Sequence, residues 1–199
     1  MEIWRYFLAG GHVMWFLLAC SIFAVMIGVQ RIRFFKQACI SEADELELTI
    51  SLKTENWEKA GVLVADKSDY MSSTVRQALQ TTGPKEREVS FENGATILIH
   101  RMHEGLRYLD TIVTLSPLLG LLGTVLGMIQ SFQVLNVKEG NMNVITGGVA
   151  EALVATAFGL IVAVLALCIH SYLIYRLDKS VTTLEEWGSL LQDRSECRL

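Results

Sequence analysis

The chain has 199 residues, of which 51% are hydrophobic and 19% charged, and its formal net charge is −4 at pH 7. This composition is more apolar and less charged than that of an ordinary soluble domain, and it indicates a membrane protein. No basic cluster with interleaved aromatic residues is present, so a nucleic-acid-binding role has no electrostatic basis. The four cysteines form no CxxC pair and have no histidine nearby at ligand spacing, which indicates neither a metal site nor a disulfide framework.

Three long runs contain no Asp, Glu, Lys or Arg: Tyr6–Gln30, Thr111–Leu135 and Ala152–Tyr175. At about 1.5 Å per residue, each is long enough to cross the roughly 30 Å hydrocarbon core as a helix. No strand pattern is visible. We therefore expect an all-α integral membrane protein with three transmembrane helices, two of them extended into a cytoplasmic helical bundle.

The chain is predicted to consist of seven segments. In order, they are an interfacial N-terminal helix at 1–11, a first transmembrane helix at 12–30, a cytoplasmic helical segment at 31–108, a second transmembrane helix at 109–135, a short periplasmic loop at 136–146, a third transmembrane helix at 147–175, and a cytoplasmic C-terminal helix at 176–199.

Basic residues predict the orientation of the spans. Most of them flank one side of the three apolar runs: Arg31, Arg33, Lys36, Arg101, Arg107, Arg176 and Lys179. The opposite side has only Arg5 and Lys138. The positive-inside rule then places the N-terminus in the periplasm and the C-terminus in the cytoplasm of a bacterial inner membrane protein. The first run ends without a small-residue cleavage site, so we expect it to remain as a span.

The segment between the first two spans is predicted to be helical. Ser41 has capping-box spacing and is expected to start a helix that ends near Leu52. Thr54 or Asn56 is expected to cap a second helix, and Ser68 and Asp69 a third, before Gly83-Pro84 interrupts the chain. From about Lys85, apolar residues recur at spacings of three and four, which predicts one helix that runs without a break into the second span. The third span is expected to continue past Arg176.

Small and hydroxyl-bearing residues share one face of the second span. They are Ser116, Gly120, Gly123, Thr124, Gly127 and Ser131. The third span has a similar face, formed by Ala152, Thr156, Gly159, Ala163 and Ala166. Such a face either lets another helix approach closely or lines a wet or proton-conducting interior, and the two faces look complementary.

These two spans carry a resemblance to a known family. The segment SPLLGLLGTVLGMIQSF, followed by GGVAEALVATAFGLIVAV, resembles the signature pair of the MotA/TolQ/ExbB proton-channel family, and most closely its ExbB and TolQ branches. The resemblance maps Thr124 and Thr156 onto the pore-facing threonines of the family, and Ser116 stands where many members have Ala. In the rest of the chain only the layout is similar, so no functional position is transferred there.

The resemblance also implies partners. Proteins similar to ExbB and TolQ form a ring, usually of five copies, around a dimer of single-span ExbD-like or TolR-like subunits that carry a membrane aspartate. The residues themselves point the same way, because hydroxyl groups relay protons but do not titrate near neutral pH, and the small faces contain no Asp, Glu or His. A titrating group is therefore expected from another chain.

Several candidate residues have both a structural and a functional interpretation. Glu151 either stabilises the start of the third span through the helix dipole or takes part in the ion path or an inter-subunit contact. The hydroxyls of Thr124 and Thr156 either bond to the carbonyls four residues earlier, at Gly120 and Ala152, or take part in a proton path. Pro117 frees the carbonyl of Val113 and is expected to kink the second span.

No Walker loop, GxGxxG, HExxH or GxSxG motif is present, so the sequence predicts neither an enzyme nor a cofactor. The favoured function is an ExbB-like motor subunit that uses the proton motive force to energise a TonB-type protein for outer-membrane transport. The alternatives are a TolQ-like subunit of the Tol-Pal system, which would act on a TolA-like protein, a flagellar-type stator subunit, and a non-conducting membrane scaffold.

Overall fold

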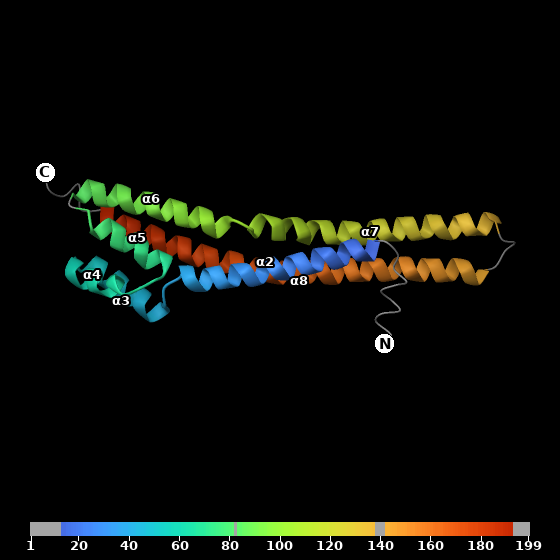
Figure 1. Cartoon of the computed structure of the whole chain (residues 1–199), viewed down its shortest axis with the longest axis horizontal. Helices are drawn as coiled ribbons and strands as arrows, with labels where there is room; N and C mark the ends of the chain where they lie inside the picture. Colours follow the sequence, from blue (N-terminus) through green and yellow to red (C-terminus); the bar gives the residue numbers. More distant parts are fainter. Residues whose placement is uncertain (1–12, 82, 138–141, 193–199) are drawn as a thin grey trace. The chain divides into compact units, whose positions relative to one another are not determined.

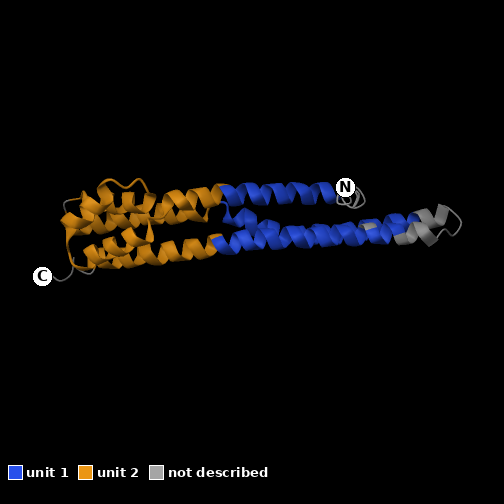
Figure 2. Cartoon of the chain, turned by 90° about the horizontal axis from the view of Figure 1, so that it is seen from below, with its two compact units in different colours: residues 1–29, 105–172 blue, residues 30–104, 173–199 orange. Residues whose placement is uncertain are grey.

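The structure is a computed structural model that describes residues 13–81, 83–137 and 142–192, with the side chains at 134–137, 142–146 and 151 left out of the description. Every regular element in these residues is a helix, which confirms the predicted all-α class (Figure 1). The predicted interfacial helix at 1–11 lies outside the described residues. The chain divides into two compact units, coloured separately in Figure 2, and each is described by itself.

Unit 1 consists of residues 1–29 and 105–172. It contains α7 (Leu106–Val137) together with the first parts of α2 (Val13–Ala38) and α8 (Met142–Gln192). The most apolar windows of these three helices have mean hydropathies of 2.2 in α2, 2.1 in α7 and 2.8 in α8, and all three are long enough to cross a membrane. The prediction of three helices long and apolar enough to span a membrane is therefore confirmed.

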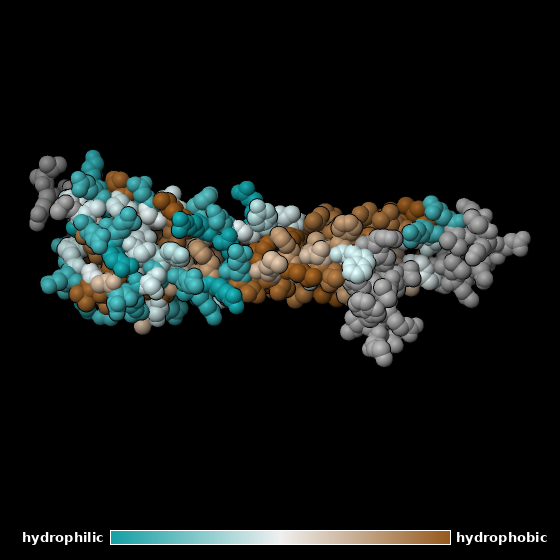
Figure 3. Space-filling model, viewed as in Figure 1, coloured by the Kyte–Doolittle hydropathy of each residue, from teal (hydrophilic) through white to brown (hydrophobic). Residues whose placement is uncertain are grey.

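The outward faces of the unit 1 helices are apolar. Phe16 on α2, Leu118 on α7 and Leu153 on α8 each expose more than half of their surface. Hydrophobic side chains dominate the visible face of this unit in Figure 3, where they are brown. Such a surface is unfavourable in water and is compatible with lipid hydrocarbon, because transfer of apolar area out of water lowers the free energy.

Inside unit 1, the start of α2 packs against α8. Val13, Met14 and Leu17 form a buried cluster with Ala155, and Leu119 and Phe158 pack against its edge. Farther along, α2 approaches α8 at Gly28, where an added methyl group would lie 2.8 Å from Cγ2 of Ile169. The first span thus covers the third by close side-chain packing.

Helix α7 continues to Val137 and α8 begins at Met142, so helical structure extends into both ends of the predicted loop at 136–146. At its other end, α8 continues to Gln192, as expected from the sequence beyond Arg176.

Unit 2 consists of residues 30–104 and 173–199. Its short helices are α3 (Glu42–Lys53), α4 (Trp57–Ala65) and α5 (Tyr70–Leu79), followed by α6 (Pro84–His103). As predicted, Asn56 caps α4 by accepting a hydrogen bond from the Lys59 amide, and Asp69 caps α5 by accepting one from the Ser72 amide. Ser41 occupies the cap position of α3, but its side chain makes no capping hydrogen bond.

The core of unit 2 is built around the last part of α8. Trp187 is fully buried, and its indole Nε1–H donates a hydrogen bond of 2.8 Å to Thr49 Oγ1 on α3. Thr183, one turn earlier on α8, donates to Glu45 Oε1 at 2.7 Å. An indole N–H buried without an acceptor is costly, so the contact with Thr49 fixes the register of α3 against α8.

The predicted unbroken helix from Lys85 into the second span is wrong. Helix α6 ends at His103, Glu104 has an extended ψ of 139°, and Gly105 has a φ of 78° before α7 begins (Figure 1). A glycine in the left-handed region is a common helix stop. Arg31 on α2 supports this helix end, because its Nη1 donates 3.1 Å to the Arg101 carbonyl and its Nη2 lies 3.9 Å from Glu104 Oε2. It thereby satisfies a carbonyl left free at the end of α6.

Candidate functional site

The candidate site lies where α7 and α8 touch through their small residues. An added methyl group at Gly123 would lie 2.8 Å from Cβ of Ala155, and one at Gly127 would lie 2.9 Å from Cβ of Ala152. At Gly159 the nearest atom would be backbone, the Ser116 carbonyl oxygen, at 2.7 Å. The two faces predicted to be complementary therefore pack against each other within one chain, and glycine is needed at these points because any side chain would separate the helices.

Thr156 links the two helices. Its Oγ1 donates a hydrogen bond of 2.9 Å to the Gly120 carbonyl on α7, rather than to the carbonyl of Ala152 on its own helix. Main-chain contact accompanies this bond, since a methyl group at Gly120 would lie 3.0 Å from Cα of Thr156. The intrahelical alternative predicted for Thr156 is therefore wrong, because the close approach of α7 provides a nearer acceptor.

Thr124 lies one turn after Gly120 on α7. Its Oγ1 donates 2.7 Å to the Leu121 carbonyl, three residues earlier, and not to Gly120 as the structural interpretation predicted. The Gly120 carbonyl, which accepts the Thr156 hydroxyl, is also the usual acceptor for the Thr124 amide in a regular helix. Both threonines are partly exposed.

The two candidate serines are buried in the contact between the helices. Ser131 is 5% exposed and donates 2.8 Å to the Gly127 carbonyl, and it faces Gly148 on α8. Ser116 is 0% exposed, and its Oγ has no hydrogen-bond partner. The structure therefore brings Ser116 and Ser131 close to α8, with Thr124 and Thr156 between them.

The other predicted residues fall on the same helices. Ala152 and Ala163 are buried, and Pro117 lies inside α7, which remains helical on both sides of it. Glu151 belongs to α8, but its side chain is outside the described residues, so its predicted role stays open.

Ala155 is a contact residue that was not among the sequence predictions. It is 1% exposed, touches the α2 cluster, and would contact a methyl group at Gly123. Its spacing, three residues after Ala152 and four before Gly159, was a signal for the same helix face. The Gly120 carbonyl was also missed, because a backbone acceptor on another helix leaves no trace in a side-chain pattern.

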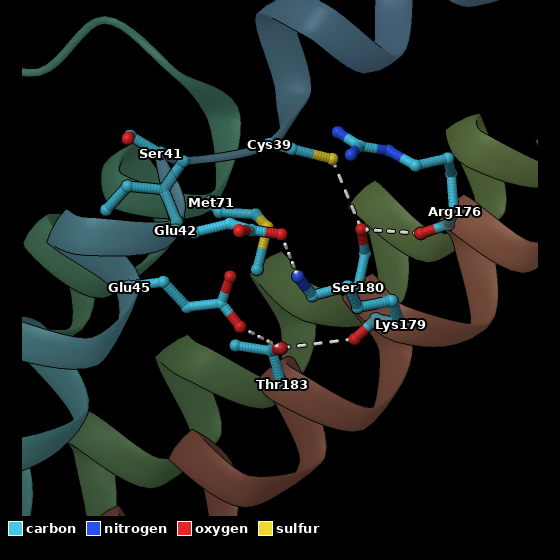
Figure 4. A pocket seen from close by; sticks show the side chains of 10 residues that line it. Cys39, Ser41, Glu42, Glu45, Met71, Arg176, Lys179, Ser180 and Thr183 are labelled. Carbon is cyan, nitrogen blue, oxygen red and sulfur yellow. Dashed lines mark hydrogen bonds and ion pairs between the residues drawn. The ribbon is translucent and has the colours of Figure 1, made fainter.

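Unit 2 contains a separate pocket of about 220 Å³, shown in Figure 4. Lys179 Nζ donates 2.6 Å to Glu42 Oε1 on one side of it, and Cys39 Sγ lies 3.2 Å from Ser180 Oγ on another. The hydrogen bond from Lys179, and then its charge, lowers the pKa of Glu42, while the bond to Glu42 raises the pKa of Lys179. Within the described residues, no group of three His, Cys, Asp or Glu side chains could hold a metal ion.

Three helices of this chain are long and apolar enough to span a membrane. Two of them, α7 and α8, meet along a seam lined by Gly120, Gly123, Gly127 and Gly159, and Thr156 places a hydroxyl group there. These features define a multi-pass membrane protein with a polar site inside its spans. The sequence profile of the MotA/TolQ/ExbB proton channel family matches residues 66–186 of the chain. The chain therefore belongs to this family, as the resemblance of its last two spans indicated.

Three relatives illustrate the relationship. An ExbB-like protein of Synechocystis sp., named as biopolymer transport protein ExbB-like 1, is 31% identical over 193 residues, which cover 94% of this chain and 76% of the relative. The biopolymer transport protein ExbB of Salmonella typhimurium is 38% identical over 97 residues, covering 47% of this chain and 40% of the relative. The Tol-Pal system protein TolQ of Haemophilus influenzae is 35% identical over 97 residues, covering 48% and 41%. ExbB and TolQ proteins both appear among the relatives, so the comparison does not separate the two branches.

Proposed function

We propose that this chain is the ring-forming subunit of an inner-membrane proton-driven motor, with the ExbB-like role of energising a TonB-type protein for outer-membrane transport. The single observation that carries the proposal is the hydrogen bond from Thr156 to the Gly120 carbonyl, which places the hydroxyl of a partly exposed residue between α7 and α8. A hydroxyl relays protons but does not titrate near neutral pH. It therefore needs a partner that brings an acidic group.

In this proposal the partner is an ExbD-like or TolR-like single-span subunit whose membrane aspartate faces Thr124 and Thr156. The ring is a homo-oligomer, usually of five copies in similar proteins, with its N-termini in the periplasm and its C-termini in the cytoplasm. Proton flow contributes about 2.3 kcal/mol per charge per 100 mV to movement of the ring relative to the partner. The protein itself is not an enzyme.

The TolQ-like role in the Tol-Pal system is the second candidate, since one relative carries that name. The client would then be a TolA-like protein. Deletion of the gene, followed by complementation, separates the two roles: failure to import iron chelates supports the ExbB-like role, and leakage of periplasmic proteins supports the TolQ-like role.

Proton conduction is tested by co-purifying the chain with its neighbouring single-span subunit and measuring proton flux in liposomes. The informative variant is Thr156→Val, which keeps the shape of the side chain and removes the hydroxyl. Its control is Thr114→Val, because the Thr114 hydroxyl is exposed on α7 and bonds only to carbonyls of its own helix. We expect the Thr156 variant to assemble but to lose most of its flux.

The outcome that contradicts the proposal is equally defined. A stable ring whose flux and motor activity depend on neither the partner nor Thr156 identifies the protein as a non-conducting scaffold. Rotation driven against a flagellar rotor would instead identify a stator subunit.

A further inference from the structure

The pocket in unit 2 is lined by charged groups of both signs. The basic groups are Arg176 and Lys179 on α8, and the acidic groups are Glu42 and Glu45 on α3. The pocket volume of about 220 Å³ is several times the roughly 30 Å³ that one water molecule occupies in the liquid. The pocket opens to the surface, since 80% of the Glu42 side chain is exposed. A small polar molecule therefore fits there.

Part of the pocket wall is already saturated by internal hydrogen bonds. The Ser180 hydroxyl donates 3.0 Å to the Arg176 carbonyl, so in the 3.2 Å contact between Ser180 Oγ and Cys39 Sγ the thiol is the donor. Thr183 Oγ1 donates its proton to Glu45 Oε1 at 2.7 Å. The protons of the thiol and of these two hydroxyls are thus in use, and the charged side chains determine what the pocket binds.

The charged side chains keep unused hydrogen-bonding capacity. Lys179 Nζ has three protons, of which one bonds to Glu42 Oε1 at 2.6 Å. The second carboxylate oxygens of Glu42 and Glu45 accept no hydrogen bond from the described residues. The five N–H donors of the Arg176 guanidinium likewise form no hydrogen bond or ion pair within the part of the chain that the structure describes, and Arg176 acts on Glu42 through its charge.

The two kinds of charge are separated along the pocket. In the view of Figure 4, the Arg176 guanidinium and the Glu45 carboxylate lie on opposite sides of the ion pair between Glu42 and Lys179. A guanidinium binds a carboxylate or a phosphate through paired N–H donors, and a carboxylate binds an ammonium group. A ligand with one sign of charge is attracted at one end and repelled at the other. The arrangement therefore favours a molecule with opposite charges at its two ends.

We propose that this pocket binds a short zwitterion, with a primary ammonium group at one end and a carboxylate or phosphate at the other. The oxyanion faces Arg176 and the ammonium group faces Glu45. This inference does not depend on the proposed motor function. Two sources supply such a group: a free metabolite, or the headgroup of an ethanolamine phospholipid, since Arg176 directly follows the uncharged run Ala152–Tyr175 on α8.

The first test uses the full-length wild-type protein in detergent and isothermal titration calorimetry. The probes are ω-amino acids of increasing length, from glycine to 5-aminovalerate, together with phosphoethanolamine. Butyrate and butylammonium are the matched probes with a single charge. We expect one zwitterion to bind about tenfold more tightly than either single-charge probe, because it gains a second charge-assisted hydrogen bond.

Variants assign the two ends of the pocket. Arg176→Gln should reduce the affinity for the zwitterion to about that of butylammonium, and Glu45→Gln should reduce it to about that of butyrate. Arg176→Lys keeps the charge without the paired donors, so it should bind with intermediate affinity. The controls are Arg33→Gln and Glu185→Gln, because both residues are exposed and neither lines the pocket. Both controls should bind the zwitterion as the wild type does.

The source of the zwitterion is decided with the protein in lipid nanodiscs. If phosphatidylethanolamine abolishes binding of the free probe and phosphatidylcholine does not, the headgroup is the ligand; equal binding in both lipids identifies a free metabolite, and either result supports the inference. Equal affinity for the zwitterion and a single-charge probe would overturn it, and so would equal losses in the control variants or no binding of any probe at millimolar concentration. Proton flux is not measured, so failure of the proposed motor function is a separate result.

Discussion

Gly159 offers the most direct test of the contact between α7 and α8. In Gly159→Ala the new Cβ would lie 2.7 Å from the Ser116 carbonyl oxygen and 3.1 Å from Cα of Gly120. Both atoms are backbone and cannot move without shifting α7. Ordinary van der Waals contacts begin at 3.4 Å. The helices must therefore separate by about 0.7 Å or distort locally, at a cost of about 1–3 kcal/mol.

The same separation acts on the candidate site. Thr156 lies one turn before Gly159, and its 2.9 Å bond to the Gly120 carbonyl would lengthen toward the limit of a hydrogen bond if the helices moved apart by this amount. The variant is therefore expected to lose stability and to weaken the link between Thr156 and α7.

The matched control is Gly147→Ala on the same helix, because an added methyl group there has no atom within 4 Å. Replacing glycine by alanine in a helix favours folding by up to about 1 kcal/mol. Thermal unfolding of the full-length protein in detergent should show Gly147→Ala as neutral or stabilised and Gly159→Ala as destabilised. Equal melting temperatures for the two variants would refute the proposed tightness of the seam.

Three further predictions concern unit 2. Trp187→Phe removes the buried donor to Thr49 and is expected to lower the free energy of unfolding by about 1–3 kcal/mol. A double-mutant cycle with Thr49→Val measures the coupling between the two side chains, and additive effects would contradict the predicted hydrogen bond. The folded-state pKa of Glu42 is lowered, so its stabilising contribution is present above the ordinary carboxyl pKa and disappears as the pH falls through the folded-state pKa. The folded-state pKa of Lys179 is raised, so its contribution is present below the ordinary lysine pKa and is lost as the pH rises through the folded-state pKa. Glu42→Gln should therefore flatten the acid limb of a stability profile slightly, as expected for an exposed pair, and an unchanged limb would argue against the pair. Arg31→Met should speed amide hydrogen exchange at the end of α6, and Arg31→Lys should have a smaller effect. Protection equal to wild type in Arg31→Met would show that the Arg101 carbonyl needs no hydrogen bond from Arg31.

The spans and the short helices were predictable from the sequence for local reasons. An uncharged run of more than twenty residues has few alternatives to a membrane helix, because every backbone polar group must be satisfied within the segment. The caps at Asn56 and Asp69 were also predictable, since each side chain bonds to an amide only three residues away. Small residues at helical spacing likewise identified the faces of α7 and α8 that meet.

The end of α6 was not predictable in this way. Apolar residues keep their helical spacing across the end of α6, so periodicity alone favours one long helix. The helix instead ends because Gly105 has a left-handed φ and because Arg31, about seventy residues earlier in the chain, donates to a carbonyl at the helix end. A residue that distant leaves no local signal for a helix end.

The sequence by itself determined that this protein crosses the membrane three times, that it belongs to the ExbB and TolQ type of membrane protein, and that Thr124 and Thr156 lie on small helix faces. These properties depend on hydrophobicity and on spacing along one helix. Only the tertiary structure decided that the Thr156 hydroxyl donates to a carbonyl on another helix. Thr156 can reach the Gly120 carbonyl only because glycine at both Gly120 and Gly159 lets two backbones approach within contact distance, and that proximity arises when separate helices pack.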